Sequence, residues 1–152
     1  MFKKQELKKI KKETEEFFKK MSFEVEVSLS FQEETLKIDL RSEDPRVLIG
    51  EKGKILVDLQ RILRTILNRK LDQTFFIDLD INDYKKKKIR YLKELAREAA
   101  DDVILTKKEK VLPPMSAYER RIVHLELADR RNVTTQSIGE EPERRVVIRP
   151  YP

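Results

Sequence analysis

The chain contains no cysteine and no tryptophan, and it has only one histidine and three glycines in 152 residues. The lack of cysteine excludes disulfide bonds and thiolate metal sites, and it favours a reducing compartment. One histidine is too few for a histidine-based metal cluster. Apolar runs are short and the first residues, MFKKQELKKIKKE, are densely charged, so neither a membrane-spanning helix nor a signal peptide is predicted. We expect a cytoplasmic protein without membrane insertion, metal ion or cofactor.

Charged residues, in contrast, are abundant. They make up 41% of the chain, against 39% for apolar residues, and the net charge is +6. Residues 1–80 hold 17 Lys and Arg against 16 Asp and Glu, a net +1, whereas residues 81–152 hold 17 against 12, a net +5. This basic surplus in one half favours a polyanionic partner, nucleic acid before membrane, although it also serves solubility.

Residues 1–81 show apolar patterns in the order α-β-β-α-α-β. Apolar residues recur at helical spacing over residues 4–21 and again over residues 55–67, and they alternate with polar residues over 23–31 and 36–40. Pro45 is typical of the first turn of a short helix that ends at Gly50, and residues 75–79 form a further β-prone run. We predict one domain, residues 1–81, with a three-stranded sheet and helices on one face.

Residues 82–152 predict a second, small α/β domain. A helix from a cap at Asn82 or Asp83 extends to about residue 105, and Ser116 with Glu119 has the spacing of a capping box for another helix. Two β-like runs, 133–138 and 145–149, are separated by GEEP and predict a hairpin. The fold class expected for the whole chain is therefore α+β.

Two of the three glycines, Gly50 and Gly53, lie in the segment VLIGEKGKIL between a short helix and a long one. Glycine is needed where φ is positive, or where another group comes too close for a Cβ atom. The N–H groups at the start of the long helix favour an anion, and Lys52 and Lys54 would add positive charge. On these residues alone, a tight turn and a phosphate-binding loop are both open.

Arg120 and His124 lie four residues apart on the helix after Ser116, and so share one face. A surface arginine beside a core histidine is one interpretation, and a general base at His124 is another. No cysteine nucleophile, serine motif or recognisable pair of carboxylates accompanies His124, so we expect no enzymatic activity.

The order of elements, with GxxG between the two middle helices, resembles a type II KH domain. Residues 113–150, which include YERRIVH, resemble an R-three-H domain, named for an arginine and a histidine with three residues between them. A KH domain followed by an R-three-H domain is similar to the bacterial Jag family, also called EloR or KhpB. Many members carry a separate N-terminal Jag domain, and we expect this chain to lack it.

The resemblance implies binding of single-stranded RNA, with single-stranded DNA as an alternative. It implies that the backbone clamp consists of Gly50, Glu51, Lys52, Gly53 and Lys54, with apolar residues such as Val47, Ile49 and Ile55 beside it. It likewise implies phosphate contacts on the second domain by Arg120, Arg121, His124 and Arg145, with Arg144 and Arg149 as flanking candidates. Glu51 departs from the basic residue often found in this loop.

The same resemblance implies post-transcriptional regulation linked to cell elongation or division, and a homodimer or pairing with a small single-KH protein. Two other functions stay open on the sequence. One is a dimerising protein-interaction scaffold with weak RNA affinity, and the other is a nuclease or nucleotide hydrolase that uses His124.

Overall fold

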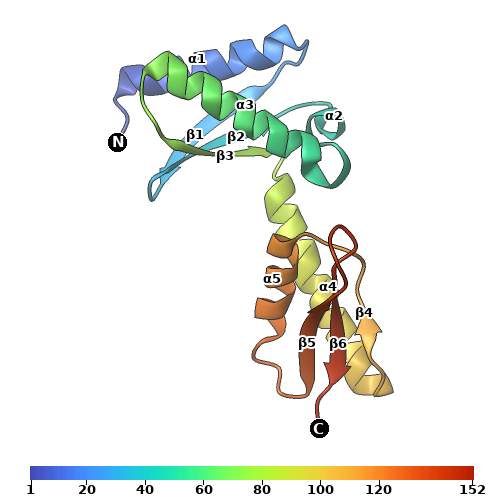
Figure 1. Ribbon diagram of the computed structural model, residues 1–152. Helices are drawn as coiled ribbons and strands as arrows, with labels where there is room; N and C mark the ends of the chain where they lie inside the picture. Colours follow the sequence, from blue (N-terminus) through green and yellow to red (C-terminus); the bar gives the residue numbers. More distant parts are fainter. The chain divides into compact units, whose positions relative to one another are not determined.

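Two units, Met1–Lys85 and Lys86–Pro152, make up the chain in a computed structural model that describes residues 1–152 (Figure 1). The first unit contains α1 (Lys4–Lys20), β1 (Glu26–Gln32), β2 (Thr35–Arg41), α2 (Pro45–Ile49), the 3-10 turn η1 (Glu51–Gly53), α3 (Lys54–Leu71) and β3 (Phe76–Ile81). Helix α4 (Tyr84–Thr106) begins at its end. The second unit holds most of α4, then β4 (Lys110–Val111), α5 (Ala117–Leu127), β5 (Val133–Ile138) and β6 (Arg145–Pro150). The predicted α+β fold class is confirmed.

The sheet of the first unit has the order β1-β2-β3, with β1 antiparallel and β3 parallel to the central strand β2. A parallel neighbour requires a crossover connection, which α2, η1 and α3 provide between β2 and β3. Alternation along β2 places three apolar residues on one buried face, and each lies opposite a buried residue of β3 in the pairs Leu36–Ile77, Ile38–Leu79 and Leu40–Ile81.

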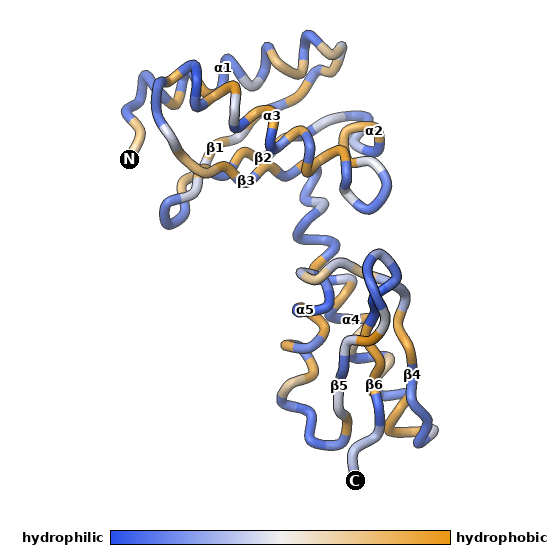
Figure 2. The backbone as a smooth tube through the Cα atoms, viewed as in Figure 1, coloured by the Kyte–Doolittle hydropathy of each residue, from blue (hydrophilic) through white to orange (hydrophobic).

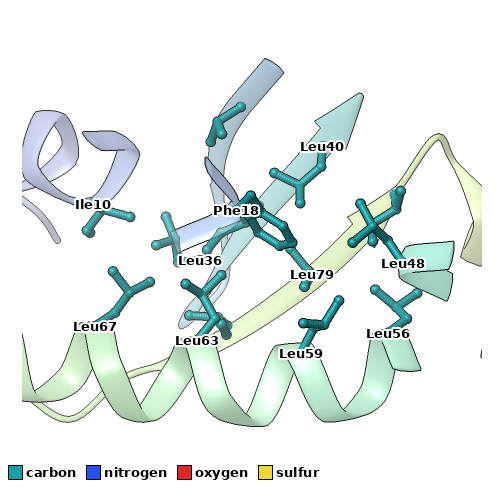
Figure 3. Packing of buried hydrophobic residues seen from close by; sticks show 14 residues of the cluster. Ile10, Phe18, Leu36, Leu40, Leu48, Leu56, Leu59, Leu63, Leu67 and Leu79 are labelled. Carbon is teal, nitrogen blue, oxygen red and sulfur yellow. The ribbon is translucent and has the colours of Figure 1, made fainter. Parts of the chain in front are cut away.

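Helices α1 and α3 cover one face of this sheet (Figure 1). Hydrophilic and hydrophobic segments alternate along both helices (Figure 2), as expected of helices with one buried side. Figure 3 shows the core between helices and sheet, to which α1 contributes Ile10 and Phe18, and α3 contributes Leu56, Leu59, Leu63 and Leu67.

The buried stripe of α3 is narrower than the sequence pattern predicts. The pattern groups Ile55 and Ile62 with the leucines, but their side chains are 43% and 49% exposed. Both lie about 100° around the helix from a neighbouring buried leucine, and a helix touches a sheet along one line of side chains only. The first unit therefore keeps apolar side chains on its surface.

The start of α4 also differs from the prediction of a cap at Asn82 or Asp83. Both residues have positive φ angles, 49° and 58°, unlike the extended backbone usual at an N-cap. The side chain of Asn82 instead bonds to the backbone of Ser42, accepting from its N–H and donating to its C=O at 2.9 Å each. Asp80 takes over the capping contact, because its Oδ1 accepts from the N–H of Lys85 at 3.1 Å.

The second unit has a sheet of order β4-β6-β5, in which the central strand β6 is antiparallel to both neighbours. The predicted hairpin is β5 and β6, and the predicted capping box is present: Ser116 Oγ accepts from Glu119 N–H, and Glu119 Oε2 accepts from Ser116 N–H. Alanines on α4 pack with apolar residues of α5 and β6 to form the core, which includes Ala96, Ala99, Ala100, Val123, Leu127, Val146 and Ile148. No helix of either unit is both long and apolar enough to span a membrane.

Candidate nucleic-acid interface

The GxxG loop, residues 50–53, owes both of its glycines to backbone geometry. Gly50 has φ 72° and ψ 179°, a region that is essentially restricted to glycine, and Gly53 has the left-handed values φ 77° and ψ 15°. A Cβ atom on Gly50 would lie 2.6 Å from Cγ1 of Ile55, and one on Gly53 would lie 3.1 Å from the Tyr84 ring. The turn alone is therefore sufficient reason for these glycines, and they do not by themselves demonstrate a ligand.

The side chains of this loop do face solvent. Glu51, Lys52 and Lys54 are exposed, and their side chains make no hydrogen bond or ion pair with the protein. Gly53 is the N-cap of α3 and offers no side-chain cap, and the first turn of α3 contains no acidic residue. The N–H groups at this helix end are therefore open to an external acceptor, and two free lysines lie next to them.

Apolar side chains border the loop on both sides. Val47 of α2 is 51% exposed and Ile55 of α3 is exposed as well, whereas Ile49 is half-buried. Their neighbours Leu48 and Leu56 point into the core and hold the two helices against it (Figure 3). The loop thus combines backbone donors, positive charge and an apolar surface, which is the set of groups that holds a nucleotide strand with its bases splayed.

Arg120 is placed differently from the exposed phosphate contact that the resemblance implies. Its side chain is buried, with the residue only 8% exposed, and its Nη1 donates to Met115 O and to Glu141 Oε1 at 2.8 Å each. The capping box at Ser116 starts α5 so that Arg120 faces inward, toward the loop between β5 and β6. Arg120 is a positioning residue in this structure, and a phosphate would have to replace Glu141 to reach it.

His124 lies one turn further along α5 and faces strand β5. Nδ1 is 2.7 Å from Thr135 Oγ1, and Nε2 is 2.8 Å from Ser137 Oγ. Burial and the nearby positive charge of Arg120 lower the pKa of His124 below its usual value. The imidazole is therefore neutral at neutral pH, and both of its nitrogens are occupied by hydroxyl groups, an arrangement that does not present a general base to a substrate.

The remaining predicted arginines fall into two groups. Arg121 is exposed and its side chain has no hydrogen bond or ion pair, so its guanidinium is free to contact a phosphate. Arg145 bonds to Glu143, and Arg149 bonds to Glu109 and Gln136. Arg144 donates to Gly139 O. The structure thus brings Arg120, His124 and Arg121 onto one helix but leaves only Arg121 without a protein partner.

Three residues of this site were missed by sequence reasoning: Thr135, Ser137 and Glu141. Thr135 and Ser137 are two residues apart on β5, so they point to the same face of the strand and both reach His124. The alternation of hydroxyl residues on a strand was a signal available in the sequence. Nothing in the sequence pairs Glu141 with Arg120, because Glu141 lies 21 residues further along the chain, in a loop that the fold brings back to α5.

Three carboxylates of the first unit, Asp39, Asp80 and Asp83, have oxygen atoms within 4.8 Å of one another. Two of them already have protein partners. Asp80 Oδ1 accepts from the N–H groups of Ile81 and Lys85, and Asp83 pairs with Arg41 at 2.6 Å. Hydrogen bonding at the end of β3 accounts for this cluster.

Comparison with known proteins places an R-three-H domain at residues 90–150, which include Arg120 and His124. The RNA-binding protein KhpB of Clostridium symbiosum is 34% identical over 136 residues, which are 88% of this chain and 61% of that protein. The proteins of the same name from Lactiplantibacillus plantarum and Bacillus subtilis are 36% and 33% identical, over 75% and 81% of this chain and 35% and 60% of their own lengths.

The chain therefore spans about three fifths or less of the curated relatives that it matches. These relatives are named for RNA binding and not for a reaction, and the match to the second unit is to a binding domain. Both findings agree with the expectation that the chain is not an enzyme.

Proposed function

We propose that the chain is a non-enzymatic, single-stranded RNA-binding protein of the Jag (EloR/KhpB) family, with a KH domain in the first unit and an R-three-H domain in the second. The observation that carries this proposal is the open GxxG loop. Unpaired N–H groups at the start of α3 and the free Lys52 and Lys54 lie at one exposed turn, beside the apolar side chains of Val47 and Ile55. The relatives named as RNA-binding proteins support the same class of ligand.

In the first unit, the GxxG loop would hold about four nucleotides by their backbone, while the apolar surface receives the bases. Glu51 is the one group that opposes this, since its exposed carboxylate directly precedes Lys52 in the loop. Repulsion of phosphate by Glu51 would keep the affinity of this loop modest.

In the second unit, Arg121 is the side chain best placed to contact phosphate, with Arg120 and His124 holding α5 against β5 and the following loop. Two weak sites on one chain reinforce one another, because binding at the first raises the effective concentration of RNA at the second. The affinity of the whole chain would then exceed that of either unit.

The biological setting implied by the family is regulation of RNA in the bacterial cytoplasm, linked to cell elongation or division. A homodimer, or a complex with a small single-KH protein, belongs to the same proposal. Both are expectations of the family and rest on the similarity to KhpB proteins.

The proposal is tested by fluorescence anisotropy with a labelled pool of single-stranded RNA. Glu51→Asp with Lys52→Asp makes the loop acidic, and we expect this variant to bind at least about fivefold more weakly than the parent. Lys12→Glu is the matched control, because it also lowers the net charge by two and Lys12 is exposed on α1 without a partner. Equal affinity of loop variant and control would show that the GxxG loop does not bind RNA.

A second candidate function, a dimerising scaffold, is favoured by the exposed apolar side chains of Val47, Ile55 and Ile62. Salt separates the two functions. RNA binding should weaken steeply as salt is added, because bound cations are released from the phosphates, whereas an apolar dimer should respond little. Light scattering over the same salt series would report the dimer directly.

A further inference from the structure

A second basic site lies on the first unit, on the C-terminal half of α3, the end farther from the GxxG loop. Side chains of α3 and of the segment between α3 and β3 line a hollow of about 600 Å³. Arg61, Arg64 and Arg69 contribute three positive charges to its lining, and Asp72 contributes one negative charge. The surplus of positive charge in a concave surface favours an anionic ligand.

Two of these arginines are available to a ligand as they stand. Arg61 and Arg69 are exposed, and neither side chain makes a hydrogen bond or an ion pair with the protein. Both line the hollow, and their positions on α3 are about 12 Å apart along the helix axis. No contact within the chain accounts for two free guanidinium groups along one side of this hollow.

Arg64, between them, is fixed against the free edge of strand β3. Its Nε donates to Phe75 O at 3.1 Å, and its Cζ lies 4.3 Å from the centre of the Phe76 ring. β3 is an edge strand, and Phe76 is 57% exposed on it. An exposed aromatic ring with a guanidinium stacked on it offers a flat surface for a nucleobase, and the free arginines next to it offer donors for phosphate.

We propose that this hollow, with Phe76 beside it, binds the phosphate backbone and a base of the same single-stranded RNA that occupies the GxxG loop. The inference rests on the proposed function, because the loop determines where the strand enters. Lys54, at the loop end of α3, and Arg61 are separated by about 10 Å along the helix axis. A strand that continues a few nucleotides beyond the roughly four held at the loop would reach the arginines.

The test compares two labelled RNAs, one of about four nucleotides and one of about 12, the shorter being matched to the loop alone. The charge-reversal variant is Arg61→Glu with Arg69→Glu, and its matched control is Lys8→Glu with Lys12→Glu. Lys8 and Lys12 are exposed on α1, have no partner and do not line the hollow. Each replacement lowers the charge by two, so both variants fall from +6 to +2.

The expected result is that the arginine variant binds the longer RNA about tenfold more weakly than the control does, and binds the shorter RNA equally well. The slope of log affinity against log salt should also fall by about 1.4, since each lost phosphate contact on a single strand removes about 0.7. Arg61→Gln with Arg69→Gln should show a smaller loss of the same kind and guards against an effect of the introduced carboxylates. Circular dichroism melts check that all variants are folded.

Equal affinity of the arginine variant and the control for the longer RNA would overturn this inference. The proposed function would still stand if the loop variant, Glu51→Asp with Lys52→Asp, weakens both RNAs. Failure of the parent protein to bind either RNA would overturn both. A change in oligomeric state by light scattering, with RNA affinity unchanged, would identify the hollow as a protein contact surface and would equally overturn the RNA site.

Discussion

Arg120 and Glu141 form an ion pair in which the cation is inside the protein and the carboxylate is outside. Nη1 and Oε1 are 2.8 Å apart, and the side chains are 10% and 58% exposed respectively. The same nitrogen donates to Met115 O, just before α5. One guanidinium thus joins the segment before α5 to the loop between β5 and β6, and Glu141 occupies the direction from which a phosphate would approach it.

Removal of the Glu141 charge should therefore strengthen RNA binding. In Glu141→Gln the amide holds Arg120 less firmly and no longer repels phosphate, so we expect about threefold tighter binding. Glu140→Gln is the control, because Glu140 is an exposed neighbour in the same loop whose side chain has no partner. Anisotropy titrations of both variants decide the matter, and equal affinities would show that phosphate does not reach Arg120.

Arg120 and Arg121 should respond in opposite ways to replacement by alanine. Arg120→Ala removes a buried group with two hydrogen bonds, so the free energy of unfolding should fall by about 1–3 kcal/mol. Arg121→Ala removes an exposed side chain without a partner, so stability should change by less than about 0.5 kcal/mol while RNA affinity falls. Urea unfolding and anisotropy on the same two proteins measure both quantities. Loss of stability in Arg121→Ala alone would contradict the structure.

Gly50→Ala should destabilise the first unit by about 1–3 kcal/mol, because its backbone conformation is strained for any other residue. Part of this loss comes from the contact with Ile55, whose Cγ1 and Cδ1 atoms would lie 2.6 and 2.8 Å from the new Cβ. In an Ile55→Ala background the same substitution should therefore be less damaging. A double-mutant cycle by urea unfolding gives the coupling energy between the two positions, and a coupling of zero would show that the backbone alone is responsible.

The pH dependence of stability should report on His124. Its pKa is lowered in the folded state by burial and by Arg120, so the unfolded chain binds a proton more readily below the ordinary pKa of about 6.5. The stabilisation is fully present above that pKa and is lost as pH falls toward the folded pKa. Thermal melts at about pH 7.5 and about pH 5.5 should show a larger drop in Tm for the parent than for His124→Gln. Parallel pH profiles for the two proteins would contradict the assignment.

Local sequence patterns predicted most of the fold. Alternation at Leu36, Ile38 and Leu40 identified β2, and the spacing of Ser116 and Glu119 identified the start of α5, because both depend on neighbours along the chain. The prediction placed the cap of α4 at the wrong residue. Asn82 has the right side chain for a cap, but its hydrogen bonds go to Ser42, 40 residues away, and sequence proximity cannot reveal that competitor.

The candidate site was predicted in part. The loop glycines and the lysines beside them lie where the sequence placed them, because they act through the local backbone and through exposure at a helix end. The role of Arg120 could not be predicted, since helical spacing places it on the same face as His124 without showing whether that face is inside or outside. The hollow with Arg61 and Arg69 was not foreseen either, because sequence periodicity shows an arginine face but not the edge strand and Phe76 ring beside it.

The sequence by itself determined the element order, the position of the GxxG loop and the basic surplus of the second half, because each follows from composition or from contacts within a few residues. Only the tertiary structure decided which of the charged groups are free. Arg120 is held by Glu141 and His124 by two hydroxyls of β5, whereas Arg121, Lys52 and Lys54 are left to solvent. The reason is physical: a charge is neutralised by whatever the fold brings within hydrogen-bonding distance, and those partners come from distant parts of the chain.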